Sequence, residues 1–178
     1  MHLLTEAAQV NSGDTAWIIV CTALVLLMTP GLAFFYAGLV RSKHALGMIM
    51  QSFVTIAIVS VTWVLVGYSL AFDHDAFGGL IGGIHLAGLT HAEVGVPGQH
   101  LTVPPLAFVA FQLMFAILTA ALISGASADR MRFGAFVTFI AIWSILVYAP
   151  LAHWVWSPEG WLHKAGLLYF AGGTVVEI

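Results

Sequence analysis

The chain has 178 residues, of which 61% are hydrophobic and only 7% are charged, and its mean hydropathy is +1.01. Soluble domains carry roughly 25% charged residues, so this composition excludes a soluble globular domain and indicates an integral membrane protein. The formal net charge is −3, with only five Lys and Arg residues, which excludes a basic stripe and a nucleic-acid partner.

The apolar runs predict an all-α fold, a polytopic bundle of transmembrane helices. Several runs reach the ~20 residues that a helix needs to cross a bilayer, and they lack the strict alternation of a transmembrane barrel. We expect one transmembrane domain over residues 1–178, with about four full spans and the start of a fifth. The single cysteine, Cys21, excludes an internal disulfide. Residues 1–13 contain no Lys or Arg, so the first span is expected to act as its own insertion signal.

The first predicted span covers residues 15–40, with Asp14 as its N-cap. Pro30 lies inside this span and predicts a kink. Three basic or titratable residues follow directly at 41–44, and a second span over residues 46–72 returns across the membrane.

Residues 73–104 form a predicted outer loop that is rich in Gly, His and acidic side chains. Its first three residues, Asp73, His74 and Asp75, are possible metal ligands. Three adjacent residues do not close a metal site, and no partner pair shows regular spacing. We therefore expect no metal or cofactor and interpret the segment as a solvated loop.

Pro104 and Pro105 suit the first turn of a third span that runs to residue 128, because the N–H that proline lacks is not needed there. A tight turn over residues 129–132 leads to a fourth span over residues 133–156. His153 is expected at the membrane interface. The connection 157–168 precedes a fifth helix that starts near residue 171.

The distribution of positive charge predicts the orientation. Lys164 falls on one side of the membrane, whereas the remaining cations fall on the other: Arg41, Lys43, Arg130 and Arg132. Cytoplasmic loops carry the excess of Lys and Arg. We therefore expect the N-terminus outside a cell membrane.

Glu177 is an acidic residue inside a segment that is otherwise membrane-buried in character. An intramembrane carboxylate is costly and usually faces a bundle interior or an ion pathway. At ~1.5 Å per residue, Glu177 lies roughly 9 Å inward, Phe111 roughly 9 Å and Phe115 roughly 15 Å. Phe111 and Phe115 share a helix face, and Trp156 lies above them at the outer end of the fourth span. These residues predict an aromatic cage for a small cation above an acid.

Each of these residues also has a plainer interpretation. Glu177 can snorkel to an interface, or be exposed only because the chain stops one residue later. The Phe pair can serve packing or lipid contact, and the Trp residues can form an interfacial aromatic belt. Spacing alone thus leads to a helical membrane protein with a candidate cation pathway.

Ordered motifs make the chain resemble the ammonium transporter family, the relatives of the Rhesus proteins, from about Asp14 to its end. The matching segments are CTALVLLMTPG at 21–31, FYAGLVR at 35–41, GYSLAF at 67–72, AFQ at 110–112 and FAGGTVV at 170–176. The resemblance implies eleven-helix subunits assembled as homotrimers in membrane lipid. Each subunit would have a narrow hydrophobic pore that carries ammonium, or ammonia with a proton. It also implies a possible nitrogen-regulatory protein as a partner at the cytoplasmic face.

The resemblance further implies roles for single residues. Phe115 and Trp156 correspond to the aromatic walls of an outer recruitment site, and Phe111 to a further wall. Phe115 also corresponds to the outer of two stacked rings that gate the pore. Glu177 stands where most members have the first of two pore histidines, although some members carry Glu there. Tyr169 stands where the family has a near-constant Asp, which would cap the fifth helix.

The family has six more helices than this chain, so the resemblance implies a little under half of a transporter, with no transport in isolation. The leading hypothesis is the N-terminal part of an ammonium permease rather than an enzyme. The alternatives are a fragment of an ammonium-sensing receptor and a non-functional truncated remnant.

Overall fold

The computed structural model describes residues 10–128, 130–167 and 172–177. Within them the chain is helical, apart from loops and one isolated antiparallel bridge between Asp75 and Gly82. Four helical stretches are long and apolar enough to cross a membrane: Ser12–Leu39, Ser42–Phe72, Pro105–Ser127 and Phe133–Lys164. The predicted all-α transmembrane bundle is confirmed.

Helix α1 spans Ser12–Leu39 and is capped by Asn11. The Asn11 side chain accepts hydrogen bonds from the backbone N–H groups of Gly13 at 2.8 Å and Asp14 at 3.1 Å. The prediction of Asp14 as the N-cap is therefore wrong. Asp14 lies in the first turn, where its charge favours the positive end of the helix dipole. The kink at Pro30, which lies within the helix, stays a prediction.

The second span is helical over its whole length but changes its winding. A short 3₁₀ turn, η1 (Ser42–His44), leads into α2 (Ala45–Thr62), then into the π-helical turn η2 (Trp63–Gly67) and α3 (Tyr68–Phe72). The wider π turn places one extra residue in the helix and so rotates the faces beyond it.

The third span is α4 (Pro105–Ser127), which has Pro at its first position as predicted. The fourth consists of α5 (Phe133–Trp143), a second π turn η5 (Ser144–Tyr148) and α6 (Ala149–Trp156). A short helix, α7 (Trp161–Lys164), follows, and the described chain ends in the π turn η6 (Gly173–Glu177).

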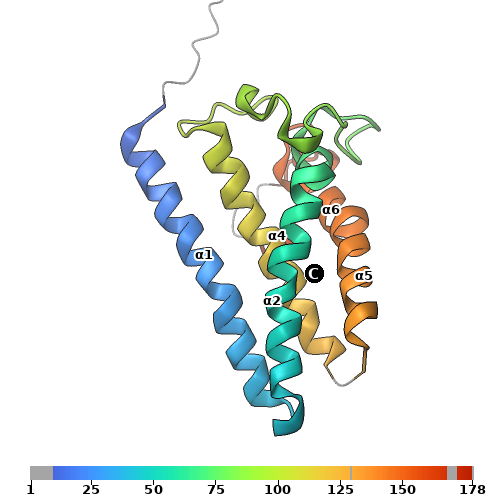
Figure 1. Cartoon of the computed structure of the whole chain (residues 1–178). Coiled ribbons are helices and arrows are strands. Elements are labelled where there is room, and N and C mark those ends of the chain that lie inside the picture. Colours follow the sequence, from blue (N-terminus) through green and yellow to red (C-terminus); the bar gives the residue numbers. More distant parts are fainter. Residues whose placement is uncertain (1–9, 129, 168–171, 178) are drawn as a thin grey trace, which may run out of the picture.

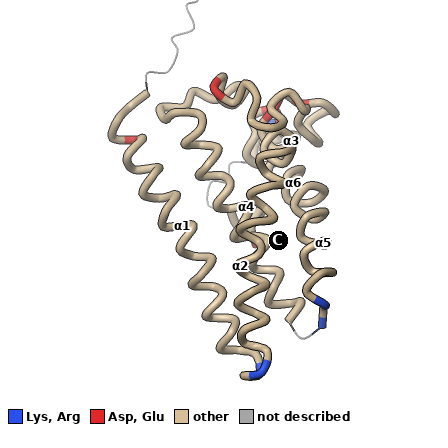
Figure 2. Tube along the Cα trace, in the orientation of Figure 1, with Lys and Arg blue, Asp and Glu red and all other residues tan. Residues whose placement is uncertain are grey.

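The spans lie side by side in one bundle (Figure 1), with α4 against α1 and α2, and α5 against α2. The two π turns meet: the Thr62 and Ser144 hydroxyls lie 3.0 Å apart, and the Trp63 and Tyr148 ring centroids 6.2 Å apart. In the backbone trace of Figure 2, blue Lys and Arg positions mark the end with the α1–α2 and α4–α5 turns, and red Asp and Glu positions are seen at the opposite end. The cost of charge in hydrocarbon keeps charged residues of either sign at the ends of the spans.

Residues 73–104 cover the acidic end of the bundle and include two 3₁₀ turns, η3 (Ala87–Leu89) and η4 (Ala92–Val94). The prediction of a solvated loop does not hold for Asp73, whose exposed fraction is 2%. Its carboxylate collects hydrogen bonds from the loop, so the segment folds over a buried charge instead of remaining in solvent.

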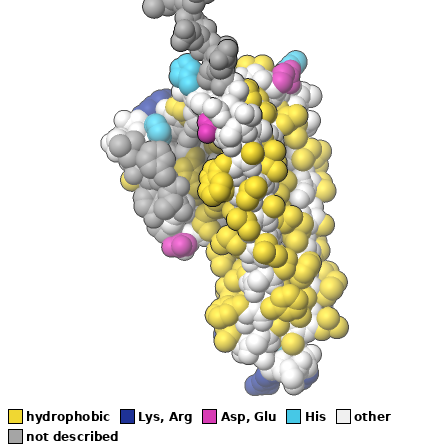
Figure 3. Space-filling view, turned by 90° about the vertical axis from the view of Figure 1, so that its left-hand side faces the viewer, with side chains coloured by type: hydrophobic (Ala, Val, Ile, Leu, Met, Phe, Trp, Pro, Cys, Tyr) yellow, Lys and Arg dark blue, Asp and Glu magenta, His cyan; other side chains and the backbone are white. Residues whose placement is uncertain are grey.

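Helix α1 presents most of its side chains outward. Only Thr29 and Ala33 are buried in it, whereas Trp17, Leu27 and Phe34 are exposed. Figure 3 shows hydrophobic side chains covering this side of the molecule. Such a surface is stable against lipid or against another apolar helix.

Candidate functional site

Three aromatic rings from two spans meet near the acidic end of the bundle. Phe111 and Phe115 lie one turn apart on α4, with centroids 5.1 Å apart and planes at 82°. The Phe115 ring is 6.3 Å from that of Trp156, the last residue of α6, at 65°. Edge-to-face contacts of this kind let the positive edge of one ring meet the negative face of another.

The loop over residues 73–104 holds the end of α6 where Trp156 lies. The Gln99 side-chain amide donates a hydrogen bond of 3.1 Å to the Trp156 carbonyl oxygen. This carbonyl belongs to the last turn of the helix and has no partner within it. The loop therefore fixes the backbone that carries the indole.

A cavity of about 530 Å³ opens beside Phe115 between α1 and α4. Its walls are mostly apolar, and Glu177 of η6 is the only ionisable residue among the described residues that line it. The lining residues are Met28, Gly31, Leu32, Phe35, Phe115, Leu118, Leu122, Val176 and Glu177.

Glu177 also lines a second cavity, of about 410 Å³, next to Trp143 and Leu151. Its side chain is exposed, whereas Val175 two residues earlier is buried. The carboxylate thus lies where the two cavities adjoin. The structure brings Phe115 and Glu177 to one cavity, and Phe111 and Trp156 each contact the Phe115 ring.

The α1 wall of this cavity was not singled out from the sequence. Met28, Gly31, Leu32 and Phe35 follow the spacing of one helix face, so helical periodicity was the available signal. In a helix that is apolar on every side, this signal does not distinguish a cavity-lining face from a lipid-facing one.

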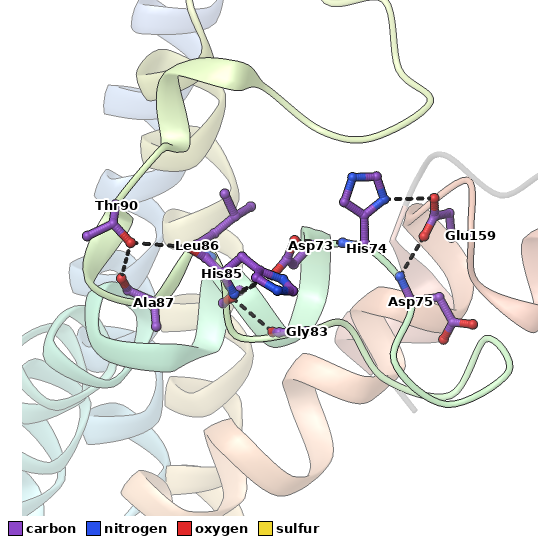
Figure 4. A network of polar contacts seen from close by, with 10 residues as sticks. Asp73, His74, Asp75, Gly83, His85, Leu86, Ala87, Thr90 and Glu159 are labelled. Carbon is purple, nitrogen blue, oxygen red and sulfur yellow. Dashed lines mark hydrogen bonds and ion pairs between the residues drawn. The ribbon is translucent and has the colours of Figure 1, made fainter.

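A polar network joins the outer loop to the ends of the second and fourth spans (Figure 4). Asp73 accepts hydrogen bonds from the backbone N–H groups of His74 at 2.8 Å and His85 at 2.6 Å. Glu159, which follows α6, accepts from the Asp75 N–H and lies 3.2 Å from the His74 ring nitrogen. Carboxylates at the acidic end of the bundle therefore organise the loop next to the aromatic group.

His153 lies in the bundle interior, and its prediction as an interfacial residue is wrong. Its side chain has an exposed fraction of 0%. Because a carbonyl can only accept, the Nδ1–H donates to the Ala71 carbonyl at 3.0 Å. Nε2 then faces the Asp75 carboxylate at 3.8 Å. The loop covers the His153 ring, and this burial cannot be predicted from the sequence of a single helix.

Asp75 gives a pH prediction for the outer loop. Burial raises the pKa of this carboxyl, but hydrogen bonds from the Gly79 and Phe77 backbone, with His153 and Lys164 nearby, outweigh it and hold the pKa below its usual value. A lowered folded-state pKa contributes stability that is present above the unfolded value, about 3.9, and is lost as pH falls through the folded one. We expect amide exchange of Phe77, corrected for intrinsic rates, to accelerate below about pH 4.

The matched control is Asp75→Asn, which keeps the side-chain shape but does not titrate. In that variant, exchange at Phe77 should follow intrinsic chemistry alone across the same pH range. An equally steep acceleration in the variant would rule out Asp75 as its source.

The fold and the cavity define a class: a multi-pass helical membrane protein with an aromatic group beside an apolar cavity between its spans. The model of the Ammonium Transporter Family matches residues 16–178. The chain belongs to the ammonium transporter family, and the predicted resemblance is confirmed.

Curated relatives agree with this assignment. The ammonium transporter of Bacillus subtilis (strain 168) is 53% identical over 167 residues, covering 93% of this chain and 40% of the relative. Ammonium transporter Amt1 of Archaeoglobus fulgidus is 45% identical over 168 residues, covering 94% of this chain and 40% of the relative. These relatives are transport proteins rather than enzymes.

Solved structures share the fold. Saccharomyces cerevisiae Mep2 superposes with a TM-score of 0.86 at 38% identity, covering 94% of this chain and 37% of that chain. A sensor Amt protein superposes with a TM-score of 0.82 at 31% identity, covering 92% of this chain and 40% of that chain.

The chain spans about 40% of the length of the curated relatives that it matches. The predicted departure at Tyr169 and the motif residues Phe170 and Ala171 lie outside the described residues, as does Asp129 of the α4–α5 turn. The effect of Tyr169 therefore stays a prediction.

Proposed function

We propose that this chain is the N-terminal part of an ammonium transporter of the cell membrane. In this proposal Phe111, Phe115 and Trp156 select ammonium at the outer mouth of the pore. Glu177 accepts a proton in the pore below them. The observation that carries the proposal is the cavity shared by Phe115 and Glu177, which has apolar walls and one acid. The curated relatives named ammonium transporters support the choice of substrate.

The rings can attract a cation without strong charge. A cation over an aromatic face gains ~0.5–2 kcal/mol once it is desolvated. Phe111, Phe115 and Trp156 are each half-buried, so part of the ring group is accessible to a ligand. This attraction is too weak to carry an ion through hydrocarbon, but it suffices to select one at an entrance.

Glu177 can accept the proton that ammonium must leave behind. One N–H bond breaks, the proton binds a carboxylate oxygen of Glu177, and neutral ammonia remains. An apolar cavity admits a neutral molecule far more readily than an ion. A histidine at this position would perform the same proton exchange.

The arrangement in the membrane completes the proposal. We place the N-terminus outside, because four of the five cations gather at the opposite end of the bundle. By analogy with the family, we also propose homotrimers of the full-length protein in lipid and a nitrogen-regulatory protein as a partner at the cytoplasmic end. The exposed apolar side of α1 suits either lipid or a neighbouring subunit.

The test is uptake of labelled methylammonium by the full-length protein in cells without their own ammonium transporters. Phe115→Ala and Trp156→Ala should raise the half-saturation concentration roughly 2- to 30-fold, the equivalent of one cation–ring contact. Phe34→Ala is the matched control, because this phenylalanine is 65% exposed on α1, and its uptake should be unchanged.

Glu177 is tested separately through the maximal rate. Glu177→Gln keeps the shape but cannot accept a proton, so the rate should fall at least tenfold, whereas Glu177→His should retain uptake. Unchanged uptake and selectivity in Phe115→Ala, Trp156→Ala and Glu177→Gln together would remove the assignment.

A second candidate function is ammonium sensing, which the likeness to the sensor Amt protein favours. A sensor would bind ammonium at the aromatic group but show no flux. Isothermal titration of the purified full-length protein, together with uptake into proteoliposomes, separates the two functions: binding with flux indicates a transporter, and binding without flux a sensor.

A further inference from the structure

A basic pocket lies at the end of the bundle opposite to the aromatic group. Its volume is about 390 Å³, and it lies between the turn that joins α1 to α2 and the turn that joins α4 to α5. The blue segments at the lower end of Figure 2 mark these turns. The lining residues are Val40, His44, Gly47, Met48, Gln51, Ala128, Arg130, Met131, Arg132 and Phe133.

The two arginines of the pocket are exposed, and neither forms an ion pair with another described residue. The backbone of Arg130 and Met131 is tied to the end of α4, because the Ser127 carbonyl accepts hydrogen bonds of 3.1 Å from the N–H groups of both residues. Guanidinium groups on a fixed turn suit an oxyanion, to which they can donate in pairs.

A buried amide adds a third donor. Gln51 is 7% exposed, and its Oε1 accepts from the Ser127 hydroxyl at 3.3 Å. The side-chain NH₂ of Gln51 has no hydrogen-bond partner among the described residues, and Gln51 lines the pocket. Ser127 thus orders both the arginine turn and this amide.

The surroundings indicate where the oxyanion comes from. Exposed Met131 and Phe133 flank the arginines, and the pocket lies at the ends of the helices that are long and apolar enough to cross a membrane. A soluble anion gains nothing from apolar side chains beside the pocket, whereas the acyl chains of a phospholipid can pack against them. Basic pockets between spans at the cytoplasmic side suit anionic headgroups.

We propose that this pocket binds the phosphate of an anionic phospholipid headgroup, held by Arg130, Arg132 and the Gln51 amide. The bound lipid bridges the α1–α2 and α4–α5 turns, so it joins the first two helical pairs of the bundle. The pocket is separate from the transport pathway, and the proposal holds whether or not the protein conducts ammonium.

The test is native mass spectrometry of the purified full-length protein titrated with phosphatidylglycerol, phosphatidylcholine or inorganic phosphate. Phosphatidylglycerol should bind more tightly than phosphatidylcholine. The double variant Arg130→Gln, Arg132→Gln should lower its affinity roughly 10- to 30-fold. The control Arg41→Gln, Lys43→Gln removes the same charge from the same end without touching the pocket, and it should keep most of the affinity.

Three results would overturn the proposal. Equal weakening in both double variants would mean attraction by surface charge alone. Equal binding of the two lipids would mean that the headgroup charge is not recognised. Displacement of the lipid by an equal concentration of inorganic phosphate would make the ligand a soluble anion. Because Arg132 occupies the N-cap position of α5, the single variant Arg130→Gln provides the same comparison if the double variant fails to fold.

Discussion

Asp73→Ala should loosen the outer loop by about 3 kcal/mol, because it removes the acceptor shared by two backbone N–H groups and leaves them without a partner. These groups belong to His74 and His85, and the Ser69 hydroxyl donates to the same carboxylate at 3.3 Å. Amide exchange at His85 should then accelerate roughly 100-fold. Hydrogen exchange of the full-length protein in detergent measures this directly.

Two control variants test whether the effect comes from the Asp73 carboxylate. Asp73→Asn keeps one acceptor oxygen and loses the charge, so its effect should lie between the wild type and Asp73→Ala. Glu93→Ala removes an exposed carboxylate from the same loop and should leave exchange at His85 unchanged. If Glu93→Ala and Asp73→Ala behaved alike, the buried carboxylate would not organise the loop.

Gly160→Ala should destabilise the protein about as much as Asp73→Ala loosens the loop, but for steric reasons. A Cβ at Gly160 would lie 2.6 Å from the Trp154 carbonyl oxygen and would also meet the His153 carbonyl. The φ angle of Gly160 is −64°, which any residue adopts, so the obstacle is space alone. Because rigid backbone must move to admit the methyl group, we expect a loss of about 3 kcal/mol. Thermal unfolding of the purified full-length protein measures this loss.

The matched substitution is Gly134→Ala, where a Cβ would meet nothing within 4 Å. Gly134 lies inside α5, so alanine there should be neutral or stabilising by up to about 1 kcal/mol. The turn that contains Gly160 follows Trp156 directly, so Gly160→Ala should also raise the half-saturation concentration for methylammonium. A stable Gly160→Ala protein would contradict the close approach.

Asp73 and Gly160 show how the acidic end of the bundle supports the proposed recruitment site. The loop closes over Asp73 and His153, and Gln99 holds the Trp156 carbonyl. The aromatic group thus rests on a folded cap rather than on the spans alone.

Much of this protein was predictable from short stretches of sequence. The spans fell within a few residues of their observed limits, since a run of about 20 apolar residues can satisfy its backbone in lipid only as a helix. The family was predictable because its motifs are contiguous segments. The cap of α1 was misassigned because Asn11 and Asp14 are both good N-cap residues, and backbone geometry chose between them.

The class of protein and the order of the helices were predictable because both depend on local hydrophobicity, and charged residues were expected at the ends of the spans because charge avoids hydrocarbon. The contacts between the rings, the cavity shared by Phe115 and Glu177, and the burial of Asp73 and His153 became evident only from the packing of the spans and the loop. These features depend on how each helix is rotated about its axis. In helices that are apolar on every side, hydrophobic periodicity cannot fix that rotation, and packing between spans and loop sets it instead.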